Sequence, residues 1–383
     1  MSFTAFRHYL HTNPRYLYAL IRQKIRLRKR FGWINRNVKT GKRVPPPLVY
    51  KITLSSACNL TCKRCMNITD HDNPKHTADY DDIDYSLFKE VIDQFGRTNP
   101  SVILSGGEPM LHCRFRDIIT LLEKRSIATH ICTNGTVLEK HIPLLATMKH
   151  ISLIVSVDGI KDVNDTVRGY GMYDKVVSGI RQLRKENRSI YIGIQHTIQP
   201  ENVASMYRFC KEMVALKVDW ILLNPCWHIS REQADGYSAF MKKEFSITAH
   251  GHEGYIMDYP VNFDQFTQQY TRIRSSQWPI QISCYYNNPV DDMRNMLTDA
   301  TYFCGNRFCY KQWIRMDIMP DGTVVSCQQF PDVILGDLHR STGEDIWNGK
   351  PFREFRNTLL RGPLPVCNKC APIYLYNGSR NAL

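Results

Sequence analysis

The chain has 383 residues, of which 43% are hydrophobic, so one large domain or two ordinary domains with a sizeable core can form. No apolar run approaches the roughly 20 residues that cross a bilayer, and no secretory signal is seen at the N-terminus. The formal net charge is +14, but residues 1–50 hold 12 Lys/Arg and no Asp/Glu, while the other 333 residues hold 38 basic and 36 acidic side chains. This nearly neutral body excludes a broad nucleic-acid-binding face, so no nucleic-acid partner is expected.

Cysteine usage indicates the compartment. The 13 cysteines are odd in number and unevenly spread, unlike a disulfide framework. Together with the missing export signal, this pattern favours a reducing cytosol, where thiols bind metal or stay free. We therefore expect a cytoplasmic protein, peripheral to a membrane if its basic N-terminal arm binds one.

Residues 1–48 are interpreted as a basic amphipathic arm and a linker. The stretch "NPRYLYALIRQKIRLRKRFG" predicts a helix over 13–32, with Asn13 as its cap, Pro14 at its first position and Gly32 at its end. Its apolar side chains recur at helical spacing between basic ones: Tyr16, Leu17, Leu20, Ile21 and Ile25.

Three interpretations of this arm stay open. The helix docks on the body through its apolar stripe, or residues 1–43 lie on an anionic membrane surface, or the segment is a mitochondrial-type targeting signal. The following "VPPPL" at 44–48 predicts a stiff linker.

From residue 49 to residue 225, short β-rich apolar runs alternate with helical patterns. Strands are predicted at 49–56, 101–107, 129–135, 151–159, 189–198 and 219–225, and helices at 84–95, 114–125, 138–148, 172–186 and 201–215. This alternation is typical of the α/β class with a parallel sheet, either an open doubly wound sheet or a partial barrel. Reactive groups are then expected at the carboxyl ends of the strands.

Four polar motifs follow predicted strands and should line one mouth. They are "SACNLTCKRC", "SGGEP", "CTNG" and "SVDG". Beyond them, residues 226–300 break the alternation, with one predicted helix at 263–274, and are interpreted as a connecting segment that covers a substrate. Residues 301–383 are interpreted as a small module centred on "MDIMPDGTVVSC" (316–327), a hairpin with Asp321 and Gly322 at its turn.

Three cysteines follow the first predicted strand in a C-x3-C-x2-C pattern: Cys58, Cys62 and Cys65. Three thiolates on one loop can hold three irons of a [4Fe–4S] cube and leave the fourth iron open for another ligand. The alternatives are three free cysteines, or a zinc site completed by His71 or His76.

With "SGGEP" (105–109) and "SVDG" (156–159), these cysteines make the sequence over residues 49–225 resemble the radical S-adenosylmethionine (SAM) superfamily. The resemblance implies a partial (β/α)6, TIM-like barrel, in which SAM chelates the open iron. One electron then cleaves SAM to a 5′-deoxyadenosyl radical that abstracts hydrogen from the substrate. A cofactor must carry this chemistry because protein side chains do not form primary alkyl radicals.

The resemblance also implies the residues that bind SAM. Glu108 and the neighbouring backbone would hold the SAM amine, while Ser156 and Arg168 would contact the ribose and the carboxylate. Glycines in "SGGEP" let backbone approach a ligand closely. The full implied set is Gly106, Gly107, Glu108, Pro109, Asn134, Ser156 and Arg168. Arg64 departs from the aromatic residue that many members carry there near the adenine, although a guanidinium can stack on a purine.

A second cysteine set comprises Cys309, Cys327, Cys367 and Cys370, in "CYKQWIRMDIMPDGTVVSC" and "LPVCNKC". This spacing resembles the SPASM/Twitch extension of radical SAM enzymes. We expect the shorter Twitch form with one auxiliary [4Fe–4S] cluster, and thus SAM and two [4Fe–4S] clusters as cofactors. The alternatives are a four-thiolate zinc site, and Cys304 in place of Cys309.

Two reactions differ in their electron balance. A dehydrogenase loses a hydrogen atom, a proton and an electron, and the auxiliary cluster can accept the electron. An epimerase needs a hydrogen donor, for which Cys226 in "LLNPCWH" is the candidate catalytic residue. The sequence leaves the general base open among His196, Asp158, His228 and Glu253.

The leading hypothesis is a radical SAM oxidoreductase or epimerase that acts on a small polar, sugar-like or lipid-linked substrate. A flavodoxin or ferredoxin would be its reductant. One alternative is a peptide-modifying enzyme, disfavoured because an arm of about 50 residues looks too short for a leader-peptide-binding domain. The other alternative is a non-catalytic metal-binding scaffold.

Overall fold

The computed structural model describes residues 14–68, 81–95, 98–284, 290–299, 302–303 and 308–370. These residues form one curved ten-stranded sheet in the order β10-β9-β8-β1-β2-β3-β4-β5-β6-β7. The strands are β1 (Val49–Ser55), β2 (Ser101–Gly106), β3 (Thr129–Thr133), β4 (Ile151–Ser156), β5 (Tyr191–Ile198), β6 (Trp220–Pro225), β7 (Gln281–Cys284), β8 (Arg315–Ile318), β9 (Thr323–Val325) and β10 (Ile334–Asp337). The neighbouring pairs from β8 to β7 in this order are all parallel, whereas the β8–β9 and β9–β10 pairs are antiparallel.

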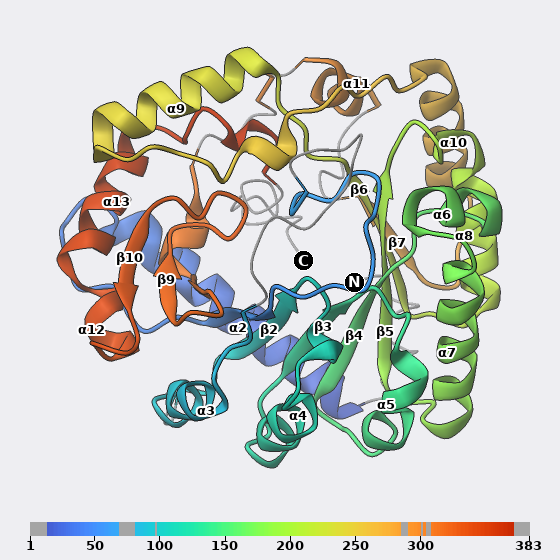
Figure 1. The fold of residues 1–383 in the computed structure, drawn as a ribbon, viewed down its shortest axis with the longest axis horizontal. Helices are drawn as coiled ribbons and strands as arrows, with labels where there is room; N and C mark the ends of the chain where they lie inside the picture. Colours follow the sequence, from blue (N-terminus) through green and yellow to red (C-terminus); the bar gives the residue numbers. More distant parts are fainter. Residues whose placement is uncertain are drawn as a thin grey trace.

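Helices cover the outer face of this sheet, as Figure 1 shows. The helices of the described residues are α2 (Pro14–Asn37), α3 (Tyr85–Asp93), α4 (Phe115–Lys124), α5 (Leu138–Leu145), α6 (Lys161–Arg168), α7 (Met172–Glu186), α8 (Met206–Ala215), α9 (Arg231–Phe245), α10 (Phe263–Ser275), α11 (Val290–Thr298), α12 (Gly343–Trp347) and α13 (Lys350–Arg361). Single turns of 3-10 helix are η2 (Pro109–Leu111), η3 (Val203–Ser205), η4 (Glu253–Tyr255), η5 (Tyr310–Trp313) and η6 (Cys367–Lys369). The predicted α/β class and partial barrel are confirmed.

Alternation along each strand explains the two faces of the sheet. Ile52, Leu54 and Leu104 are fully buried against the helices, whereas Lys51 and Ser105 point to the barrel interior and are only half-buried. Successive side chains of a strand point to opposite faces, so one face makes the core and the other is left polar. The motif loops therefore project from the carboxyl ends of strands that a large core holds in place.

The six predicted strands and five predicted helices are all present, with small shifts at their ends. Residues 201–205 precede α8 as η3 and turns, so the helix begins at Met206. Residues 226–300 contain more structure than was predicted, namely α9, β7 and α11 besides the expected α10. Helix α6, directly after "SVDG", was also missed.

The N-terminal helix differs from its prediction in length and in its buried face. It continues through Gly32 to Asn37, because Ile34 is buried in the core beyond that glycine. Leu17, Leu27 and Ile34 are buried, whereas Ile21 and Ile25 of the predicted stripe are exposed. The side chains of Tyr16 and Leu20 lie outside the described part.

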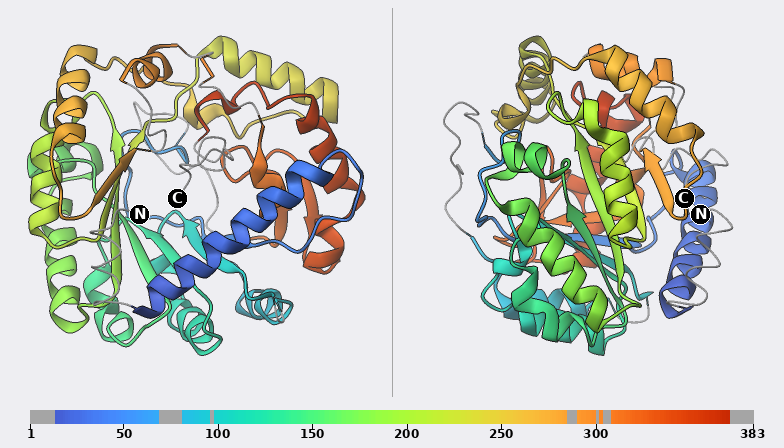
Figure 2. Two further views of the ribbon diagram at one scale, coloured as in Figure 1. Left: turned by 180° about the vertical axis from the view of Figure 1, so that it is seen from behind. Right: turned by 90° about the vertical axis from the view of Figure 1, so that its right-hand side faces the viewer.

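Two arginines of α2 dock it on the amino ends of the strands. The Arg26 guanidinium donates to the carbonyls of Thr98 (2.5 Å) and Asn99 (2.6 Å), just before β2. Arg30 donates to the Trp313 carbonyl before β8 and to the Pro46 carbonyl before β1. Helix α2 thus runs across the end of the barrel opposite the motif loops (Figure 2).

The predicted linker at 44–48 is packed rather than free. Val44 and Leu48 are buried, the Val44 amide donates to Asn348 Oδ1 at 2.9 Å, and the Trp347 indole donates to the Pro45 carbonyl at 2.9 Å. In the described part of the chain, no helix combines the length and the apolar character needed to cross a membrane.

Candidate active site

The first cysteine loop follows β1 and is held by the glycines after β2. A Cβ on Gly106, whose φ is +146°, would lie 2.1 Å from the Ser55 carbonyl oxygen, and one on Gly107 would lie 2.3 Å from the Ala57 oxygen. The amides of Gly107 and Glu108 donate to these same two carbonyls at 2.9 and 2.8 Å. The glycines therefore let the two loops touch backbone to backbone, which places Cys58, Cys62 and Cys65 at the barrel mouth.

Glu108 is fully buried, and protein donors occupy its carboxylate. Thr133 Oγ1 donates to Oε1 at 2.8 Å, an η2 amide donates to Oε1 at 3.0 Å, and the Asn134 amide donates to Oε2 at 2.6 Å. Burial raises the pKa of Glu108, and these hydrogen bonds oppose the rise. Asn134 in turn donates to Asn59 at 2.9 Å and lies 3.8 Å from Cys58 Sγ. Glu108 thereby positions the "CTNG" loop against the cysteine loop.

Arg168 ends α6 beside the second cysteine. Its Nε and Nη2 lie 2.8 and 2.7 Å from Asp158 Oδ2. Burial lowers the pKa of Arg168, but the charges of Asp158 and Cys62 outweigh it, so that the pKa is raised. The Lys63 amide also donates to the Val167 carbonyl at 3.0 Å, so the end of α6 contacts the cysteine loop directly.

Two further predicted SAM-binding residues lie at the same mouth. Ser156 is the last residue of β4 and is half-buried, in register with Gln195 of β5. Pro109 begins η2 and is buried. The assignment of these residues to SAM stays a prediction.

Arg64 pairs with the loop after β5. Its Nη1 lies 2.6 Å from Glu201 Oε2 and 3.3 Å from Gln199 Oε1, and the neighbouring Lys63 Nζ lies 2.9 Å from Glu201 Oε1. The Arg64 and Glu201 side chains are 13% and 18% exposed. Arg64 therefore fixes the cysteine loop to β5 in this structure, an arrangement that sequence spacing alone did not predict.

The second cysteine set gathers around η5 and η6. Cys309 caps η5, Cys327 follows β9, and Cys367 and Cys370 bracket η6, with the Cys370 amide donating to the Cys367 carbonyl at 3.1 Å. Burial raises the pKa of Cys367 well above its usual value, and the nearby Cys370, Cys309 and Cys327 sulfurs raise it further. All four thiols are thus close neighbours. Cys304, His71 and His76 lie outside the described residues.

A mononuclear zinc site requires closely spaced donor atoms. Tetrahedral zinc with Zn–S bonds of about 2.3 Å places its sulfurs about 4 Å apart. Among the described residues, the only three metal-binding side chains with donor atoms all within 4.8 Å of one another are Asp82, His112 and Cys113. Both His112 nitrogens are engaged there, Nε2 with the Ile83 carbonyl at 2.9 Å and Nδ1 with a backbone amide at 3.0 Å. In the described residues, no three thiols of either cysteine set meet this spacing.

An aromatic wall, formed by Trp227, Tyr255 and Phe330, lies beside both cysteine sets. The Tyr255 ring centroid lies 5.0 Å from that of Phe330 and 5.5 Å from that of Trp227. Burial raises the pKa of Tyr255 well above its usual value, and thiols of both sets (Cys327, Cys65 and Cys370), together with Cys226, add to this rise. Cys226 follows β6, is 4% exposed and lies next to this wall. Its predicted role as a hydrogen donor stays a prediction.

The candidate general bases occupy different surroundings. His196 is fully buried on the helix side of β5 and stacks on Phe209 at 4.3 Å, away from the barrel interior. Asp158 pairs with Arg168, and His228 stacks on Tyr259. Glu253 accepts from His250 at the surface. His196 is thus removed from the set of candidate bases.

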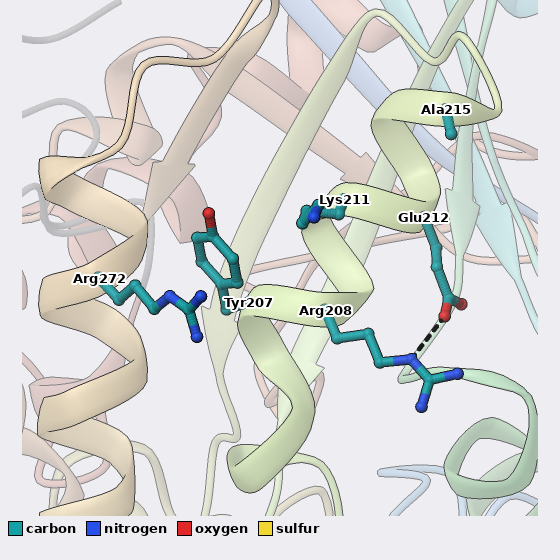
Figure 3. Close-up of a pocket in the computed structure, with 6 residues that line it drawn as sticks. All are labelled: Tyr207, Arg208, Lys211, Glu212, Ala215 and Arg272. Atoms are coloured by element: carbon teal, nitrogen blue, oxygen red, sulfur yellow. Dashed lines mark hydrogen bonds and ion pairs between the residues drawn. The ribbon is translucent and has the colours of Figure 1, made fainter.

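A surface pocket lies between α8 and α10, apart from the two cysteine sets and the candidate bases. Figure 3 shows its lining, with Arg272 of α10 over the Tyr207 ring and Arg208 of α8 paired with Glu212 at 3.0 Å. No predicted site residue lines this pocket.

Comparison with known proteins identifies the family. The family model described as the radical SAM superfamily matches residues 52–212, and the SPASM model, described as an iron-sulfur cluster-binding domain, matches residues 309–371. The chain therefore contains a radical SAM domain and a C-terminal SPASM domain. Such an enzyme uses SAM and two [4Fe–4S] clusters, as predicted, and the two thiol sets fit this requirement.

Three curated relatives are similar in sequence. Pre-heme d1 synthase of Dinoroseobacter shibae is 31% identical over 183 residues, which are 45% of this chain and 42% of that protein. The tungsten-containing aldehyde ferredoxin oxidoreductase cofactor-modifying protein of Pyrococcus furiosus is 26% identical over 84% of this chain and 86% of its own length. Mycofactocin maturase MftC of Mycolicibacterium smegmatis is 26% identical over 36% and 34%, respectively. The matches to the first and third relatives therefore span less than half of those proteins.

The fold is shared with a solved structure. Streptococcus suis SuiB bound to S-adenosylmethionine superposes with a TM-score of 0.57 at 14% identity, covering 80% of this chain and 67% of SuiB. This likeness confirms the α/β barrel architecture.

Proposed function

We propose that this protein is an oxidative radical SAM enzyme that takes a hydrogen atom, a proton and an electron from its substrate. When bound, SAM and the cluster at Cys58, Cys62 and Cys65 supply the radical that removes the hydrogen atom. A C–H bond and a neighbouring X–H bond are broken and a C=X double bond forms. The hydrogen atom would leave in 5′-deoxyadenosine and a base would take the proton. Cys309, Cys327, Cys367 and Cys370 would hold the auxiliary cluster, which would accept the electron.

The observation that carries this proposal is the position of Tyr255. It hydrogen-bonds Met66, next to Cys65, and packs on Phe330, three residues after Cys327. Both cysteine sets therefore border one buried wall, and a substrate held at that wall is near both. An electron acceptor this close to the radical site suits oxidation better than a redox-neutral reaction.

Side chains of the mouth would hold SAM. We assign its carboxylate to Arg168, which already lies between Asp158 and Cys62. Glu108 Oε1 already accepts two protein hydrogen bonds and Oε2 accepts one, so we assign the SAM amine to Oε2 together with backbone carbonyls of residues 106–108. Asn134 and Ser156 would contact the ribose side of the cofactor.

The substrate class follows from the extent of the sequence matches. The cofactor-modifying relative matches across 84% of this chain, which includes most of the 226–300 segment, whereas the mycofactocin maturase matches across 36%. We therefore propose a cofactor precursor as the substrate, with a precursor peptide as the alternative. The relatives give no support for a sugar or a lipid.

A membrane contact through α2 would lie at the end of the barrel opposite the cysteine loops. Tyr18, Ile21 and Ile25 form an exposed apolar row on α2, with Arg22 and Arg28 exposed beside it. We infer that this row can bind an anionic surface, and flotation with anionic liposomes should retain the protein but not an Ile21→Glu, Ile25→Glu variant. The mouth would then face away from the bilayer, which disfavours a lipid-linked substrate.

Anaerobic reconstitution tests the main proposal. The wild type should bind about eight irons per chain, as two four-iron clusters require, and release 5′-deoxyadenosine after reduction. Cys327→Ala should still cleave SAM but form no oxidised product, whereas Cys58→Ala should do neither. Cys113→Ala, at an exposed cysteine outside both sets, is the control. Zinc content without SAM cleavage in the wild type would contradict the proposal.

A further inference from the structure

A buried lysine lies beside the auxiliary cysteine set. Lys311 is 2% exposed, and its Nζ lies 2.9 Å from Asp317 Oδ2 and 2.7 Å from the Ser326 carbonyl oxygen. Lys311 is two residues from Cys309, and Ser326 directly precedes Cys327. The ammonium group therefore comes from the turn that follows Cys309 and hydrogen-bonds the residue that precedes Cys327.

The same carboxylate serves a second buried cation. Arg315 is 8% exposed, and its Nε lies 2.7 Å from Asp317 Oδ1, while its Nη2 donates to Oδ2 at 3.1 Å. Asp317, itself 1% exposed, thus pairs with both Lys311 and Arg315. Lys51 of β1 is the register partner of Asp317 and adds a third cation on the same face.

Two buried arginines also contact η5, the turn that begins after Cys309. Cys309 stands at the start of η5, directly before Tyr310. At its end, the buried Arg356 donates to the Gln312 carbonyl at 2.9 Å, and the buried Arg30 of α2 donates to the next carbonyl. The carboxylate of Asp332 is engaged elsewhere, because it accepts from Tyr237 at 2.8 Å and from two backbone amides.

Buried cations that share one carboxylate are costly unless a further anion faces them. A four-iron core with four thiolates supplies that anion, since its net charge is about −2 and falls by one more when it accepts an electron. A fixed cation stabilises the more negative, reduced form. Net charge and hydrogen bonds to the sulfurs are among the properties that set cluster potentials.

We propose that Lys311, supported by Arg315 and Lys51, is the built-in counter-ion of the auxiliary cluster and raises its reduction potential. This assignment rests on the proposed function, in which that cluster accepts the substrate electron. It deepens that function by naming the residues that make the cluster an acceptor. Lys311 acts on the cluster and is a positioning residue, not a catalytic one.

The test is a potentiometric titration followed by EPR of the full-length chain with Cys58, Cys62 and Cys65 changed to Ala, so that only the auxiliary cluster assembles. Lys311→Met should lower the midpoint, with at least a tenfold loss of electron affinity, which is 59 mV for one electron. Asp317→Asn should raise it, and the double variant should return near the starting value. Lys311→Arg keeps the charge and should shift it little. Lys242→Met, at an exposed lysine of α9, is the control.

Opposite signs separate a charge effect from structural damage, because damage would move both single variants the same way. A shift of the same sign in Lys311→Met and Asp317→Asn, or one of less than twofold in both, overturns the assignment. If Lys311→Met fails to assemble a cluster, the direction in Asp317→Asn decides alone. In the enzyme with all cysteines, Lys311→Met should keep 5′-deoxyadenosine release but lose product. If the potential shifts but the amount of product per 5′-deoxyadenosine does not change, the counter-ion assignment holds and the proposed function is overturned.

Discussion

The Tyr255 hydroxyl lies 2.9 Å from the sulfur of Met66 and donates a hydrogen bond to it. Met66 follows Cys65 directly, so η4 is joined to the first cysteine loop. Gly254 shows how tight this contact is, since a Cβ there would lie 2.1 Å from the Met66 carbonyl oxygen. On its other side the Tyr255 ring packs on Phe330 beyond Cys327. One buried tyrosine thus links the two cysteine loops.

Replacing Tyr255 should therefore loosen both loops. Tyr255→Phe removes one hydrogen bond and should cost about 1 kcal/mol of the free energy of unfolding. Tyr255→Ala also leaves a cavity and should cost about 3–5 kcal/mol, with a loss of bound iron. Chemical denaturation and iron analysis measure both effects. Tyr170→Phe, at a tyrosine that is 95% exposed, should change neither, and a neutral Tyr255→Ala would contradict the linking role.

Gly107→Ala should disable the first cluster and spare the second. The added methyl group would lie 2.3 Å from the Ala57 carbonyl oxygen, so the cysteine loop must move. We expect about half of the wild-type iron and no SAM cleavage. Gly236→Ala is the matched control, because no heavy atom lies within 4 Å of the added carbon in α9, and it should stabilise the helix by about 0.5–1 kcal/mol. Full iron content in Gly107→Ala would show that the loop adapts.

Arg64 and Glu201 should behave as a coupled pair. Their atoms lie 2.6 Å apart and both side chains are largely buried. A double-mutant cycle with Arg64→Ala and Glu201→Ala should give a coupling energy of about 1 kcal/mol in denaturant unfolding. SAM affinity should fall in both single variants, since both release the cysteine loop. A coupling near zero, with SAM affinity lost only in Arg64→Ala, would instead indicate a direct adenine contact.

The buried His196 should make the protein acid-sensitive. Burial lowers its pKa to about 4, whereas an unfolded histidine titrates near 6.5. The unfolded state therefore binds more protons between these values, so the stabilising contribution is complete above about pH 6.5 and falls as the pH drops towards 4. The loss at pH 4 should be about 3 kcal/mol.

His196→Leu should remove this part of the pH dependence of unfolding, relative to the wild type at pH 7 and pH 4.5. NMR of labelled histidine provides a second measurement, because the His196 imidazole should stay neutral down to about pH 5. An imidazole midpoint near 6.5 would contradict the prediction.

Cys226→Ala distinguishes the two reaction types. If the protein oxidises its substrate, this variant should form product at a rate close to that of the wild type. If Cys226 returns a hydrogen atom in an epimerisation, the variant should cleave SAM but accumulate or quench the substrate radical. Deuterium uptake from solvent into the wild-type product would support the epimerase, and Cys226→Ser is the size-matched companion.

Most strands and helices of the fold could be predicted from the sequence, because hydrophobic periodicity and the positions of the motifs indicate them. The strands before the four motif loops were predicted, since each is a short apolar run with turn residues at its ends. Helix α9 was missed although it has a signal, a capping box in which Ser230 and Gln233 bond each other's backbone. Strand β7, with four residues, is too short for a periodic pattern.

Contacts between distant residues could not be derived in this way. Arg64 and Glu201 are 137 positions apart, and nothing local pairs them. The docking of α2 depends on Arg26 and Arg30 donating to carbonyls, whereas hydrophobic periodicity points to Ile21 and Ile25. The buried surroundings of Lys311 could not be derived from the sequence either, because only the fold places Asp317 beside it.

The hydrogen bonding of β8 to β1 has a consequence for dividing the chain. Strand β1 is held between β2 and β8, with Val49 in register with Arg315 and Ile52 with Ile318. A fragment that ends before β8 would leave this parallel strand with an open row of backbone donors and acceptors beside an apolar face, which is a template for self-association. The barrel and the C-terminal module therefore cannot be exchanged independently. A chimaera that joins the barrel to a different module would have to restore the pairing of β1 with β8.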